Sequence, residues 1–88
     1  MAEVTYSAHA LETLASAAAN AGSANAIESA VNTLAAHPLV GRRVDGDLRE
    51  LVISFGETGY VALYRFVAQQ DQVRVLALRS QRDIGYMP

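Results

Sequence analysis

The spacing of apolar residues changes once along this 88-residue chain, near residue 48. Before that point they recur at the three- and four-residue intervals of a helix, from Ala8 onward and again after Ser23. The break at 20–22 ends in a glycine, which ends helices readily, and the second helix is expected to end near Ala36, ahead of a proline. The expected apolar stripes are Ala8, Leu11, Leu14, Ala15 and Ala18 in the first helix and Ile27, Ala30, Val31, Leu34 and Ala35 in the second. This pattern predicts an antiparallel helical hairpin.

Beyond a connector at 38–47, apolar and polar residues alternate with the period of strands. The expected strands are 48–55, 60–67 and 73–79, with turns at 56–59 and 69–71 and a further short strand at 2–6. Within the last strand, one face is expected to carry Val73, Val75, Ala77 and Arg79. We therefore predict a single α+β domain over residues 1–88, with an N-terminal strand and an antiparallel helical hairpin packed on a three-stranded antiparallel meander (β-α-α-β-β-β). The face of the sheet opposite the helices is then free to bind a partner.

The composition favours a folded chain without a cofactor. Hydrophobic residues make up 51% and charged residues 18%, which is too apolar for a disordered chain. There is no Cys, His9 and His37 stand alone, and no phosphate-binding glycine motif occurs, so neither a metal nor another cofactor is expected. No apolar run reaches the ~18 residues of a membrane span, and the start lacks the pattern of a signal peptide. We expect a cytoplasmic protein with no membrane contact.

The net charge of −2 is unevenly distributed. Residues 1–41 contain three acids and no cation, whereas residues 42–88 contain seven Arg and six acids, so that −3 and +1 give −2. A protein that holds nucleic acid by its backbone gathers cations on one face. Seven Arg against six acids leave little net positive charge, so strong direct nucleic-acid binding is disfavoured.

The chemistry of the second half lies in its Arg residues, because Arg is permanently charged and presents a planar fork of donors. The candidates for contact with a partner are Arg49, Arg65, Arg79, Arg82 and Tyr86. For Arg49 and Arg65 a second reading is equally open, in which each forms an intramolecular ion pair that orders the sheet. The acids expected to pair with a mid-strand Arg are Glu50, Glu57 and Asp83.

Several short motifs occur in order along nearly the whole chain. They are P-x-x-G-R from Pro38 to Arg42, L-R-E-L from Leu48 to Leu51, G-Y-V-A-L-Y-R from Gly59 to Arg65, and V-L-A-L-R-x-x-R-D-x-G-Y from Val75 to Tyr86. With S-x-x-A-x-x-x-L at Ser7, Ala10 and Leu14, this set resembles the RelE/ParE superfamily of type II toxin–antitoxin toxins, also called plasmid stabilisation proteins. The resemblance implies the same order of elements as the pattern does, a cognate antitoxin as partner, and assembly either as a homodimer or as a toxin–antitoxin hetero-oligomer.

The superfamily has two functional branches, and the resemblance is to the superfamily as a whole. RelE-type members cleave mRNA on the ribosome, while ParE-type members poison DNA gyrase. The cleaving branch has two basic residues two apart on the strand at 48–55 and an Arg just after the G-Y of the next strand, where this chain has Val52, Ser54 and Val61. Of the cleaving set, only an Arg after the last strand and a C-terminal aromatic remain, at Arg82 and Tyr86. Most of the cations that would stabilise a developing phosphorane are therefore missing.

The leading hypothesis is a ParE-like toxin without catalytic residues, which captures gyrase and is neutralised by an antitoxin that lays an amphipathic segment in a groove between helical hairpin and sheet. The second is a ribosome-dependent mRNase that uses Arg82 and Tyr86, with Arg49, Arg65 or Arg79 as phosphate clamps. The third is a non-toxic member that only binds an antitoxin. The sequence leaves all three open.

Overall fold

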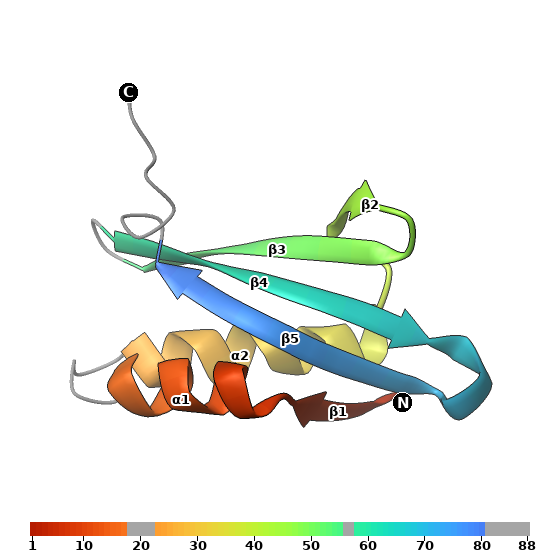
Figure 1. Cartoon of the computed structure of the whole chain (residues 1–88), viewed down its shortest axis with the longest axis horizontal. Coiled ribbons are helices and arrows are strands. Elements are labelled where there is room, and N and C mark those ends of the chain that lie inside the picture. Colours follow the sequence, from red (N-terminus) through yellow and green to blue (C-terminus); the bar gives the residue numbers. More distant parts are fainter. Residues whose placement is uncertain (18–22, 56–57, 81–88) are drawn as a thin grey trace.

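One mixed sheet carries the helices on one of its faces in the computed structural model of the chain (Figure 1). The structure describes residues 1–17, 23–55 and 58–80. Within them the elements are β1 (Glu3–Tyr6), α1 (Ala8–Ala17), α2 (Ser23–Ala36), β2 (Arg42–Asp45), β3 (Leu48–Phe55), β4 (Thr58–Val67), a 3-10 turn (Ala68–Gln70) and β5 (Gln72–Ser80). The strand order is β1-β5-β4-β3-β2, with β1 parallel to β5 and the other neighbours antiparallel. The predicted α+β order, from N-terminal strand through helical hairpin to antiparallel meander, is confirmed.

The junction of β1 and α1 is fixed by Ser7, which caps the first turn of α1. Its hydroxyl oxygen accepts the N–H of Ala10 at 3.0 Å, which satisfies one of the free donors of the first helical turn. The same hydroxyl donates to the carbonyl oxygen of Leu76 at 2.7 Å, and the Ser7 N–H donates to the carbonyl of Val75 at 2.9 Å. One residue therefore starts the helix and ties it to β5.

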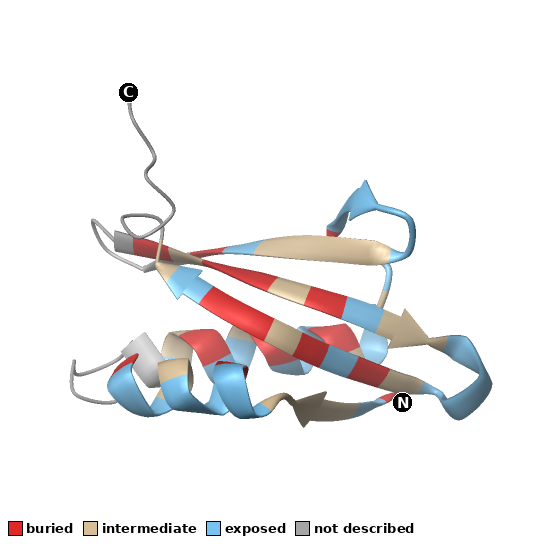
Figure 2. Cartoon of the chain, viewed as in Figure 1, coloured by how far each residue is buried: buried red, intermediate tan, exposed pale blue. Residues whose placement is uncertain are grey.

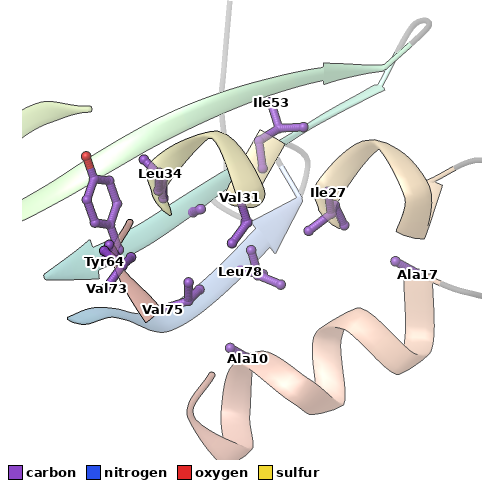
Figure 3. Packing of buried hydrophobic residues seen from close by; sticks show 12 residues of the cluster. Ala10, Ala17, Ile27, Val31, Leu34, Ile53, Tyr64, Val73, Val75 and Leu78 are labelled. Atoms are coloured by element: carbon purple, nitrogen blue, oxygen red, sulfur yellow. The ribbon is translucent and has the colours of Figure 1, made fainter. Parts of the chain in front are cut away.

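The core lies between the helices and the sheet, where the buried segments of α2, β4 and β5 face one another (Figure 2). Helix α2 buries Ile27, Val31 and Leu34, which follow the predicted stripe. Tyr64 is the largest fully buried side chain, and it lies among Val73, Val75 and Leu34 (Figure 3). The side chains that decide the packing thus come mostly from elements that the apolar period predicts.

The stripe predicted for α1 is wrong in part. Leu14 is half-buried as expected, but Ala8, Leu11 and Ala15 are exposed, and Ala18 lies outside the described residues. The residues that α1 buries instead are Ala10 and Ala17. Alanine is tolerated on either face of a helix, so an Ala-rich segment gives little information on its orientation, and small side chains allow close approach to the sheet.

Two details of the sheet depart from the prediction. The expected connector at 38–47 contains β2, whose four residues are all exposed; such an edge strand has no buried face and therefore no alternating apolar pattern. In β5, a bulge at Leu76 shifts the register between Leu63↔Ala77 and Tyr64↔Val75. Because one extra residue reverses the faces beyond it, Leu78 is buried on the helix side and the single predicted face of β5 is wrong.

The helices of the described part are both too short to cross a membrane.

Candidate functional site

The sheet face that points away from the helices carries a row of three cross-strand partners, which we call the outer row: Val52, Val61 and Arg79. Val52 pairs with Val61 across β3 and β4, and Val61 pairs with Arg79 across β4 and β5. The neighbouring row, with Ala62 opposite Leu78, is buried against the helices. Since alternate residues of a strand point to opposite faces, the outer row faces away from the core. The structure therefore brings together positions 27 residues apart in sequence at one surface.

The outer row ends in a cation, Arg79, at the end of β5. Arg79 is exposed and, among the described residues, its guanidinium has no hydrogen-bond or ion-pair partner. It lines an open pocket of about 290 Å³ with His9, Thr13 and Leu78, where α1 passes the end of β5. At the other end of the row the Val52 side chain is 56% exposed. Val61, between them, is buried at 9% exposure. The row thus offers one exposed aliphatic side chain, Val52, and a permanent positive charge at Arg79, on either side of a buried valine.

Arg65 has a structural partner. Its Nε donates to Oδ1 of Asp47 at 2.9 Å, whereas the sequence suggested Glu50, Glu57 or Asp83 as the acid. Asp47 was missed because it lies in the turn that joins β2 to β3, and β2 was not expected. Both side chains are substantially exposed, so the pair contributes about 0–1 kcal/mol. Of the two readings of Arg65, the structure supports the intramolecular ion pair.

Arg49 is also occupied, and it lies on the helix side of the sheet opposite Tyr64. Its Nη1 donates to the carbonyl oxygens of Leu39 at 3.0 Å and Gly41 at 2.8 Å. The partners are backbone carbonyls rather than the expected carboxylates. Arg49 therefore holds the segment between α2 and β2 in place.

Tyr64 completes what we call the inner network, formed by Gly41, Arg49 and Tyr64. The Tyr64 hydroxyl accepts the N–H of Gly41 at 2.8 Å. Burial raises the pKa of Tyr64 above its ordinary value of 10.0, while the Gly41 N–H and the Arg49 charge oppose this rise. A Cβ at Gly41 would lie 2.5 Å from the Tyr64 hydroxyl oxygen and 2.7 Å from the Glu50 carbonyl oxygen. The glycine of the P-x-x-G-R motif is thus required by close approach.

Three predicted positions cannot be placed. Arg82 and Tyr86 lie outside the described residues, and for Ser54 only the backbone is described, where it pairs with Gly59. One exposed feature was missed from the sequence: Leu39 and Val40, which with His37 and Pro38 line an open pocket of about 370 Å³. The signal was an apolar pair inside an otherwise polar connector. Among the described residues, no three His, Cys, Asp or Glu side chains gather as a metal site.

Two solved structures share this fold over nearly the whole chain. The intact E. coli RelBE toxin–antitoxin complex contains a chain similar to this one with a TM-score of 0.70 and 14% sequence identity, covering 90% of this chain and 95% of that chain. A metal-bound toxin from Helicobacter pylori is similar with a TM-score of 0.62 and 13% identity, covering 96% and 99%. The chain therefore shares its fold with chains of these two structures.

The sequence itself matches the family model of the ParE toxin of the type II toxin–antitoxin system parDE over residues 4–85. This chain therefore belongs to the ParE toxin family, within the RelE/ParE superfamily. A comparison with curated proteins gave no significant match. The superfamily inferred from the ordered motifs is confirmed.

Proposed function

We propose that this chain binds and poisons DNA gyrase and is neutralised by a cognate antitoxin. The observation that carries the proposal is the outer row. Two of the three positions that are basic in the cleaving branch, Val52 and Val61, are cross-strand partners on one surface. An aliphatic pair therefore stands where a nuclease of this fold needs cations.

The chemical reason concerns charge. Attack of a ribose 2′-OH on phosphate requires a base, an acid and donors or cations around the developing negative charge. In the outer row Arg79 is the one cation, and the other described Arg residues on β3 and β4, Arg49 and Arg65, are held by Leu39, Gly41 and Asp47. The described part of the surface thus lacks the electrostatic stabilisation that RNA cleavage needs.

The same surface suits a protein target. Interface hot spots combine apolar contact with Arg, and charged residues elsewhere in the interface core are few. Val52 supplies exposed apolar area, and Arg79 supplies a charge that has no partner among the described residues of the chain. Gyrase acts on DNA in the cytoplasm, so the proposal also places the toxin there.

The antitoxin partnership is proposed from the family and from the similar fold in the RelBE toxin–antitoxin complex. The assembly would be a toxin–antitoxin hetero-oligomer, with a toxin homodimer as the alternative that size-exclusion chromatography with light scattering distinguishes.

The direct test is DNA supercoiling by purified gyrase in the presence of the purified chain. We expect inhibition at micromolar toxin, and no inhibition would refute the gyrase target. Primer extension on mRNA from induced cells tests the nuclease alternative, and discrete codon-level cuts that vanish in Arg82→Ala would replace our proposal with it. Unimpaired growth on expression without antitoxin would instead indicate the non-toxic member.

A further inference from the structure

Strand β3 has an open edge over more than half of its length. It runs for eight residues, from Leu48 to Phe55, and pairs with β4 along all of them. On its other side β2 pairs only with Leu48, Arg49 and Glu50. Among the described residues, no strand covers the backbone of residues 51–55 on that side. Unpaired backbone groups at a sheet edge form a template for a further strand.

The inner network keeps this edge open. If β2 continued backward in the register that pairs Arg42 with Glu50, Gly41 and Leu39 would lie opposite Leu51 and Ile53. Instead the N–H of Gly41 is bound by Tyr64, and the carbonyls of Leu39 and Gly41 are bound by Arg49. Both side chains lie on the helix side of the sheet. Three hydrogen bonds thus use backbone groups of residues 39–41 that could otherwise extend the ladder, and Leu39 and Val40 stay outside the pairing of β2 with β3.

The segment that stays outside the pairing presents an apolar surface beside the open edge. Leu39 is 58% exposed and Val40 is 60% exposed, and both line the pocket of about 370 Å³. Gly41, the next residue, approaches the Glu50 carbonyl, where the pairing of β2 with β3 begins. Arg42 and Arg43 follow directly and are exposed; Arg42 forms an ion pair with Glu50, and the Nε of Arg43 donates to the carbonyl oxygen of Gly46. The open edge, an apolar pocket and two cations therefore adjoin one another.

We propose that an extended segment of the antitoxin adds as a strand to β3 at residues 51–55 and places an apolar side chain in the pocket at His37–Val40. The proposal rests on the antitoxin partnership above. An acidic residue next to that apolar side chain would complement Arg43, which has no carboxylate partner among the described residues, whereas Arg42 is already paired with Glu50. The site differs from the groove between helical hairpin and sheet that the sequence suggested.

A second copy of this chain fits the edge less well. Only five residues of β3 are open, and the β2 hairpin of each copy stays in place beside them. A strand pair of that length buries far less than the ~1,000 Å² that a stable interface needs. A single extended segment has no such restriction, because it can pair with the edge and continue into the pocket.

The test uses the complex of the full chain with the product of the small reading frame next to its gene. Two matched variants introduce Asp at similarly exposed apolar positions: Val40→Asp at the pocket, and Leu11→Asp on α1, where the side chain is 52% exposed. Neither change touches the core, and equal thermal melting checks this. We expect Val40→Asp to weaken the complex about tenfold or more and Leu11→Asp to change the Kd by less than about twofold.

Amide hydrogen exchange on the wild-type chain gives a second measurement that needs no variant. Outward-pointing amides of residues 51–55 exchange rapidly in the free chain and become protected in the complex. Weakening by Leu11→Asp but not by Val40→Asp, or edge amides that stay unprotected, would overturn the edge proposal alone. Absence of any wild-type binding would remove the antitoxin partnership and the edge proposal together.

Discussion

The inner network and the outer row use the same residue type in opposite ways. In the inner network Arg49 donates to two backbone carbonyls and holds a loop beneath the sheet. In the outer row Arg79 is exposed, and none of its described neighbours binds it. Arg49 is therefore occupied by folding, whereas the described part of the chain leaves Arg79 available for a partner. Changes in the first region should alter stability, and changes in the second should alter binding.

The largest expected effect is that of Gly41→Ala in the inner network. A Cβ there would lie 2.7 Å from the Glu50 carbonyl, a backbone atom that cannot move independently. We expect a loss of about 3 kcal/mol in the free energy of unfolding, measured by urea denaturation. Gly46→Ala is the matched control: its φ is 57° but nothing lies within 4 Å of a Cβ, so it should lose only about 1 kcal/mol. Equal losses in the two variants would show that Gly41 is not closely packed.

Arg49→Gln tests the comparison most simply, because Arg79→Gln is its counterpart on the outer row. Removing the charged donor from two carbonyls should cost about 2 kcal/mol of unfolding free energy. Arg79→Gln should change it by less than about 0.5 kcal/mol, since the described part of the chain gives that side chain no partner. Similar losses for both would erase the distinction between the two regions.

Tyr64→Phe leaves the Gly41 N–H without its acceptor and should cost about 1–2 kcal/mol near pH 7. The substitution should also change how the free energy of unfolding depends on pH in the alkaline range. The pKa of Tyr64 is raised in the folded state, so above pH 10.0 the unfolded chain loses this proton before the folded chain does. The contribution of the neutral Tyr64 to the free energy of unfolding is therefore fully present below pH 10.0 and is lost as the pH rises above it. The gap in stability between wild type and Tyr64→Phe should therefore narrow above pH 10, and chemical denaturation at several pH values measures it. Burial also raises the pKa of Tyr6, which both proteins share.

The smallest effect is expected for Asp47→Asn, which removes the acid of the Arg65 pair. This pair is exposed, so the free energy of unfolding should fall by less than about 1 kcal/mol, and the difference should shrink further in high salt. A larger, salt-independent loss would mean that Arg65 is as deeply integrated as Arg49.

The helical hairpin and the meander could be predicted because their buried faces repeat with the periods of a helix and a strand. β2 could not, since all four of its residues are exposed and three of them are charged. The bulge at Leu76 could not, since a single unpaired residue leaves the alternation on either side intact. Val52, Val61 and Arg79 were each singled out from the sequence, but the register was needed to show that they pair across neighbouring strands. The partners of Arg49 and Arg65 lie in segments whose path depends on β2, so the sequence left their roles open.

The central claim is that the outer row, and not the remaining Arg residues, contacts the target. Its most direct test is the concentration of toxin that halves gyrase supercoiling, compared between Arg79→Ala and Arg74→Ala. Arg74 is also exposed on β5, but it is held by Gln70 and Gln72. The account predicts that Arg79→Ala raises this concentration about tenfold or more while Arg74→Ala leaves it within about twofold. Equal inhibition by both variants and the wild type would contradict it.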